Sequence, residues 1–135
     1  MSNQWKQIQI NELDKGYGKA SYAKIIDNEQ GLQIDLVFDN STQIQFLFET
    51  SVLSYNVCDE GRRLKTLDFL TNQYGPEFIT GSPVYMVENS EYLNWFHMEC
   101  YNIFSDHPIY HYVFLTSNDI VDVLTTYTPK IRFAN

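Results

Sequence analysis

The sequence predicts an α+β fold, in which a meander-rich antiparallel β-sheet carries about two helices packed on one face. Three observations lead to this prediction. Residues 32–39 and 43–49 alternate apolar and polar side chains with a period of two. Residues 60–74 place apolar side chains at helical spacing, and residues 109–116 are β-branched and aromatic, as strands are. The length of 135 residues fits one globular domain that spans 1–135.

The clearest strands lie in the first half of the chain. Apolar residues fill the even positions of 32–38 and 44–48, whereas most odd positions are polar, with Val37 as an exception. The linker Asn40–Thr42 is short and turn-like, so these two segments predict a β-hairpin. Residues 20–27 and 52–57 are expected to add neighbouring strands, which gives a meander of three or four. Ile8 and Ile10 alternate with glutamines, which indicates a short strand or arm.

The strongest helix signal covers Glu60–Tyr74. One stripe of this segment carries Leu64, Leu67, Leu70, Thr71 and Tyr74. Asp59 is suited to cap its start, and Gly75-Pro76 is a strong stop because proline cannot continue a helix. A second, shorter helix is expected within 91–100, capped by Asn89 or Ser90.

Two further segments complete the predicted elements. Residues 109–116 predict a strand, and Ser117–Asp119 a turn. Residues 120–127 fit either a strand or a helix capped by Asn118 or Asp119. We prefer the strand, because Ile, Val and Thr dominate and Pro129 closes the segment soon afterwards.

The charge narrows the choice of partners. The formal net charge is −8 and the isoelectric point about 4.6. Such a chain repels phosphate backbones, so we expect no nucleic-acid partner and instead favour a basic protein. The polar amino terminus and the short apolar runs predict neither a signal peptide nor a membrane segment. We therefore expect a cytoplasmic protein with free thiols at Cys58 and Cys100.

Known catalytic and metal-binding patterns are weak in this chain. His107 and His111 have the spacing of a helical metal pair, but Pro108 favours an extended backbone, which would hold them roughly 13 Å apart. His97 and Cys100 would supply only two ligands, whereas structural zinc normally has four. No phosphate-binding loop or nucleophile elbow is present. We expect no metal, no cofactor and no catalytic residue.

The candidate binding residues fall into two groups. The charged candidates are Asp59, Glu60, Arg62, Asp119 and Asp122. A helix cap, a turn and a solvated helix face explain most of these equally well. The aromatic candidates are Tyr55, Tyr92, Trp95 and Tyr112, because the chain holds more aromatic rings than its core needs, and exposed Tyr and Trp suit an interface. Core packing is the competing explanation for each ring.

Several short segments also carry a resemblance. They are Ser54-Tyr55, Asp59-Glu60-Gly61, Tyr92 with Trp95-Phe96, His111-Tyr112, and Asn118-Asp119 with Asp122-Val123. Over roughly 52–131 the chain resembles small uncharacterised proteins of Bacillus and related Firmicutes, some of which look like immunity proteins encoded beside secreted polymorphic toxins. The resemblance implies a cytoplasmic binder of a toxin domain, without catalysis of its own.

Three hypotheses follow. The favoured one is a non-catalytic, immunity-like domain that binds a basic partner through an acidic, aromatic surface and has no deep polar pocket. The second is a small-molecule-binding domain or minor enzyme with a pocket between sheet and helices, formed by Arg62, His111 and an acid. The third is a subunit that self-associates through an edge strand.

Overall fold

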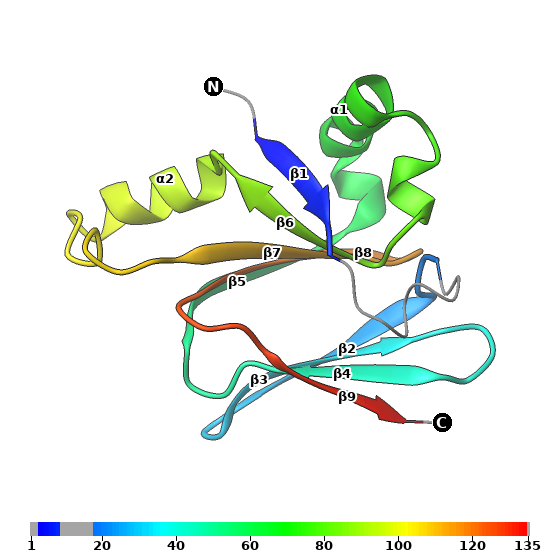
Figure 1. Cartoon of the computed structure of the whole chain (residues 1–135), viewed down its shortest axis with the longest axis horizontal. Coiled ribbons are helices and arrows are strands. Elements are labelled where there is room, and N and C mark those ends of the chain that lie inside the picture. The colour runs from blue at the N-terminus through cyan, green and yellow to red at the C-terminus, as the bar shows by residue number, and fades with distance from the viewer. Residues whose placement is uncertain (1–2, 9–17, 135) are drawn as a thin grey trace.

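The computed structural model describes residues 3–8 and 18–134, which form nine strands, two α-helices and two short 3₁₀ helices (Figure 1). The strands are β1 (Gln4–Gln7), β2 (Tyr22–Asn28), β3 (Gly31–Val37), β4 (Gln43–Leu47), β5 (Val52–Asp59), β6 (Val84–Glu88), β7 (Tyr110–Leu115), β8 (Asp119–Thr125) and β9 (Lys130–Ala134). The helices are η2 (Glu60–Arg62), α1 (Leu64–Tyr74), η3 (Phe78–Thr80) and α2 (Glu91–Glu99). This confirms the predicted α+β class.

The strands form two antiparallel sheets rather than one. The four-stranded sheet has the order β2-β3-β4-β9, and the five-stranded sheet has the order β1-β6-β7-β8-β5. The meander is therefore confirmed for β2, β3 and β4. It ends there, because β5 crosses to the other sheet and pairs with β8, and β9 returns to pair with β4.

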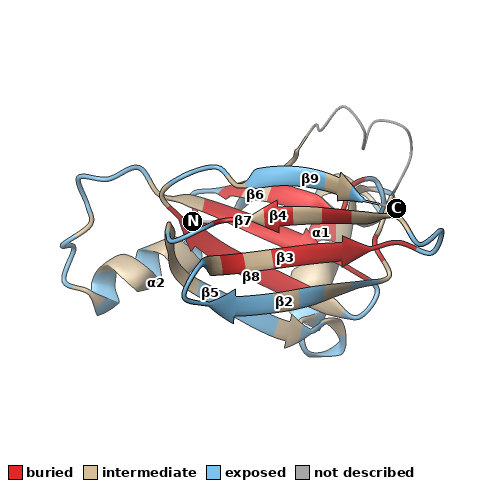
Figure 2. Ribbon diagram, turned by 90° about the horizontal axis from the view of Figure 1, so that it is seen from below, coloured by how far each residue is buried: buried red, intermediate tan, exposed pale blue. Residues whose placement is uncertain are grey.

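The molecule has three layers, with the five-stranded sheet in the middle (Figure 1). One core lies between the two sheets and is built from the alternating apolar side chains of β3 and β4, among them Ile34 and Phe46, against Phe114 of β7. A second core lies on the opposite face of the five-stranded sheet, where Leu70 of α1 packs near Trp5 and Tyr85. The period-two pattern of β3 and β4 therefore arises because one face of the four-stranded sheet is buried (Figure 2).

β7 and β8 are buried on both faces because they lie in the middle layer. Residues 111–115 and 120–125 are all buried. A strand covered on both sides has no need of polar alternation, which explains the continuous apolar runs in these segments. The strand that we preferred over a helix for 120–127 is confirmed as β8.

The first helix begins later than predicted. The Asp59 carboxylate does cap a helix, since Oδ1 accepts a hydrogen bond of 2.7 Å from the Gly61 backbone N–H, but that helix is η2. α1 then begins at Leu64 and ends at Tyr74, and Gly75 follows as its C-cap with a φ of 97° that suits glycine. For the second helix, Ser90 rather than Asn89 is the cap.

Strands β6 and β9 were not predicted. Both are five residues long, and both pair with strands that are distant in sequence. β1 lies at Gln4–Gln7, slightly before the expected arm, while Ile10 falls outside the described residues.

Candidate functional site

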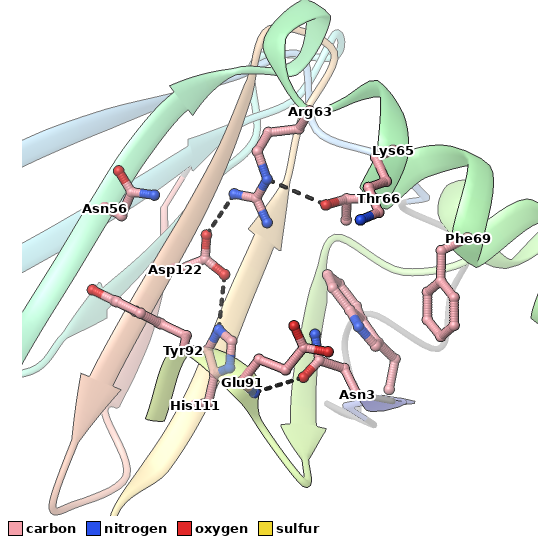
Figure 3. Close-up of a pocket in the computed structure, with 11 residues that line it drawn as sticks. Asn3, Asn56, Arg63, Lys65, Thr66, Phe69, Glu91, Tyr92, His111 and Asp122 are labelled. Atoms are coloured by element: carbon pink, nitrogen blue, oxygen red, sulfur yellow. Dashed lines mark hydrogen bonds and ion pairs between the residues drawn. The ribbon is translucent and has the colours of Figure 1, made fainter. Parts of the chain in front are cut away.

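A pocket of about 470 Å³ lies over the outer face of the five-stranded sheet, between α1 and α2 (Figure 3). Its lining comes from β1, β5, β7, β8 and both helices. The lining residues are Asn3, Trp5, Asn56, Arg63, Lys65, Thr66, Phe69, Glu91, Tyr92, His111 and Asp122.

The floor of the pocket is a buried pair from adjacent strands. His111 on β7 and Asp122 on β8 are diagonal neighbours in the antiparallel ladder, and both point toward the helix side of the sheet. The distance from His111 Nε2 to Asp122 Oδ1 is 2.8 Å. Arg63, the residue just before α1, donates from Nη1 to Asp122 Oδ2 at 2.8 Å and from Nε to Thr66 Oγ1 at 3.3 Å. Both carboxylate oxygens of Asp122 are thereby used.

These contacts keep Asp122 ionised despite its burial. Burial alone raises the pKa of the Asp122 carboxyl. The hydrogen bond and charge from His111, together with those from Arg63, outweigh burial and hold this pKa below its ordinary value. The ionised carboxylate accepts, so Nε2 of His111 carries the hydrogen and donates it.

The other nitrogen of His111 meets Ser90. Ser90 Oγ lies 2.7 Å from His111 Nδ1, and the same oxygen accepts the Leu93 backbone N–H at 2.9 Å as the cap of α2. Ser90, His111 and Asp122 therefore form a row with the residue types of a catalytic triad. However, Ser90 is buried, does not line the pocket and is committed to capping, so the arrangement gives no exposed nucleophile.

The sides of the pocket are aromatic. Tyr92 packs edge-on against the His111 ring, with 5.3 Å between centroids, and its hydroxyl lies 2.6 Å from Ser54 Oγ on β5. Trp5 of β1 and Phe69 of α1 form the opposite side, and the Trp5 indole N–H has no hydrogen-bond partner in the described part of the chain. Lys65 and Glu91 lie on opposite rims, on α1 and α2 respectively.

The predicted binding residues do not all come together. Tyr92 and Asp122 line the pocket, and Trp95 lies next to it because its ring stacks on Tyr92 with 5.8 Å between centroids. The prediction that Tyr112 is a binding residue is wrong. Its side chain faces the core between the sheets and is only 4 % exposed, so it cannot contact a partner. Tyr55 is exposed and donates to Asp27 Oδ2 on β2, the edge strand of the other sheet.

The charged group near η2 lies away from the pocket. Asp59 caps η2, Glu60 pairs with Lys19 at 3.0 Å, and Arg62 is exposed. Asp59 also stands opposite Asp119 in the ladder. Partial burial, followed by the Asp59 charge, raises the pKa of Asp119, against a smaller lowering from the Ala23 backbone N–H.

The second hypothesis placed Arg62 in a pocket with His111 and an acid. The arginine that lines the pocket is its neighbour, Arg63. Arg63, Lys65, Trp5 and Phe69 were missed as site residues. One usable signal was present, since His111 and Asp122 each interrupt a run of apolar strand residues. A polar side chain at such a position needs a buried partner, so the two predict each other.

A second surface is formed by the α2 arm, which we define as residues 91–108. Figure 1 shows the arm at one end of the five-stranded sheet, and Figure 2 shows it largely exposed. No residue of α2 is buried. The large exposed apolar side chains of the arm are Trp95 (47 %), Met98 (71 %), Tyr101 (89 %) and Ile103 (70 %).

The arm also carries acidic side chains and no lysine or arginine. It carries Glu91, Glu99 and Asp106, whereas the whole chain has no lysine or arginine between Lys65 and Lys130. The sequence contains this signal, which is visible when charge is considered segment by segment and is lost in the net charge of the whole chain.

No family model, curated protein or solved structure matches the chain. Within the described ranges, neither helix is long and apolar enough to cross a membrane. No three His, Cys, Asp or Glu side chains of these ranges are grouped so that they could hold a metal ion. The function is therefore inferred from the residues of this chain.

Proposed function

We propose that the protein is a non-catalytic protein-binding domain that binds a basic partner through the α2 arm. The observation that carries this proposal is the combination of four exposed apolar side chains with three acids and no lysine or arginine on the arm. The resemblance to immunity proteins suggests a toxin domain as the partner and the cytoplasm as the place of binding.

The energetics of interfaces support this use of the arm. Solvent-exposed apolar groups such as Trp95 and Met98 cost free energy until a partner covers them, and burial releases roughly 25 cal/mol per Å² of apolar surface. Trp95 is the natural anchor, because tryptophan is enriched among the residues that dominate binding energy. Its stacking on Tyr92 orders the indole ring before a partner arrives.

Electrostatics supports a basic partner rather than an acidic one. Acidic groups around an apolar centre accelerate association with a positively charged surface and repel negatively charged ones. The Glu91, Glu99 and Asp106 carboxylates would provide this selectivity.

The test uses purified basic proteins encoded beside the gene as candidate partners. We expect saturable binding that the Trp95→Ala/Met98→Ala variant weakens by about tenfold or more, as loss of an interface anchor does. Leu64→Ala is the matched control, because Leu64 is also an exposed helical side chain and lies on α1, outside the arm. The association rate should fall as salt is raised. Absence of binding, or equal binding by the double variant, would refute the proposal.

The favoured hypothesis also expected no deep polar pocket, and the structure has an open pocket whose lining combines aromatic side chains with several polar groups. The α2 arm gives no account of this pocket, although Glu91 and Tyr92 border both surfaces. Self-association through an edge strand stays a prediction, which light scattering at high concentration tests directly.

A further inference from the structure

We infer that the pocket between α1 and α2 binds a small organic monocarboxylate with a flat apolar body. This inference goes beyond the proposed protein-binding function, because the cationic groups that would hold the carboxylate, Arg63 and Lys65, lie at the start of α1, and only Glu91 and Tyr92 of the lining belong to the arm.

The free hydrogen-bonding groups of the pocket are mainly donors. Each Asp122 oxygen already accepts a hydrogen bond, one from His111 and one from Arg63, so the carboxylate at the floor is paired within the protein. Arg63 uses one N–H on Asp122 and one on Thr66, which leaves three of its five donors. Lys65 has no acidic partner among the described residues, although Lys6, Lys19 and Lys130 each have one. A ligand that accepts hydrogen bonds is therefore favoured.

The charge balance selects a single negative charge. Arg63 and His111 both pair with the Asp122 carboxylate, so Lys65 is the cationic side chain of the lining that has no acidic partner among the described residues. Glu91 on the opposite rim adds a negative charge, and the chain as a whole carries −8. A dianion such as a phosphate monoester would be repelled by this surplus, whereas one carboxylate can pair with the Lys65 ammonium and the spare Arg63 donors.

The aromatic walls and the volume of the pocket indicate the shape of the rest of the ligand. Trp5, Phe69 and Tyr92 present aromatic surface, which suits a flat apolar group. A volume of about 470 Å³ lies within the range of small-molecule sites, and such sites combine apolar walls with a few polar groups that fix orientation. Figure 3 shows Arg63 and Lys65 on one side of the cavity and the aromatic groups around it.

The two tryptophans provide a built-in test. Trp5 lines the pocket and Trp95 lies outside its lining, so their two indole N–H signals in a proton–nitrogen NMR spectrum report on the site and on a nearby reference. Titration with benzoate should shift the Trp5 signal saturably and leave the Trp95 signal in place. Benzyl alcohol and phenyl phosphate, added separately, serve as the neutral and dianionic probes.

Two variants that each remove one positive charge distinguish a direct contact in the pocket from the effect of the overall charge of the protein. Lys65→Met should weaken benzoate binding by about tenfold, the usual consequence of losing one charge-assisted hydrogen bond. Arg62→Met removes one positive charge from a neighbouring exposed residue that does not line the pocket, and it should leave the affinity unchanged. No saturable Trp5 shift, equal losses in the two variants, or binding of benzyl alcohol or phenyl phosphate as tight as that of benzoate would overturn the inference. None of these results bears on binding through the α2 arm.

Discussion

His111 and Asp122 meet at 2.8 Å in the buried middle layer of the protein, on two strands that are covered on both faces. Two polar residues in a core lower the stability of a fold unless each satisfies the other. Here Arg63 donates to the second carboxylate oxygen of Asp122, and the Ser90 hydroxyl bonds the second ring nitrogen of His111. The row joins the start of α1, two strands and the start of α2, so it fixes both helices that border the pocket.

The first prediction concerns Asp122→Asn. The variant removes the buried negative charge and replaces one accepting oxygen by an N–H₂ donor, so either Arg63 or His111 loses its acceptor, and the free energy of unfolding at pH 7 should fall by about 3 kcal/mol. Because the folded pKa of Asp122 is lowered, its contribution is present above the ordinary value of 3.8 and is lost as the pH falls through the folded value. Urea unfolding at several pH values measures both effects. Asp68→Asn, on the exposed side of α1, should change neither.

Asp119→Asn should raise the free energy of unfolding at pH 7, whereas Asp122→Asn should lower it. The raised folded pKa means that the native state holds this proton more tightly than the unfolded state, so stability is lost as the pH rises from 3.8 through the folded value. The variant removes the repulsion from Asp59 and should gain about 0.5 kcal/mol at pH 7, the usual size of a cross-strand charge effect. The gain should vanish in acid, where both carboxyl groups are protonated. A variant less stable than the parent at pH 7 would contradict this assignment.

Ser90→Ala tests the link between α2 and the floor of the pocket. The variant loses the cap on the Leu93 N–H and the hydrogen bond to His111, so we expect a loss of about 1–2 kcal/mol in thermal or urea unfolding. Ser105→Ala, at an exposed position of the arm, is the control. Equal stability of the two variants would show that the Ser90 hydroxyl contributes nothing.

The parts of the fold that the sequence predicts are those decided by near neighbours. The hairpin of β3 and β4 follows from alternation and a short linker, and α1 follows from its leucine stripe and Gly75. Alternation shows that one face of a strand is buried, but it does not show what covers that face. The departure of β5 to the second sheet and the return of β9 to β4 depend on pairing over long distances, which local patterns do not encode.

The sequence predicts less of the pocket than of the fold. Trp5 and Asn3 reach it from the amino terminus, because β1 pairs with β6 more than 75 residues later. The choice of Arg63 over Arg62 depends on the 3₁₀ turn that precedes α1, which directs one arginine inward and leaves its neighbour in solvent. Tyr112 was misassigned for a similar reason, since successive strand residues point to opposite faces and both faces of β7 are covered.

Tyr92→Phe should loosen the α2 arm without unfolding the protein. The Tyr92 hydroxyl ties α2 to β5 through Ser54, whereas its ring contacts with His111 and Trp95 would persist in phenylalanine. Burial is the largest cause that raises the pKa of Tyr92, so the hydroxyl stays protonated and the hydrogen bond should hold across the neutral range. Loss of one such bond, about 1 kcal/mol, should speed hydrogen exchange of the α2 amides roughly fivefold. The α1 amides serve as the internal reference. If both helices exchange faster by the same factor, the variant has lowered global stability and Tyr92 is not a local tether of the arm.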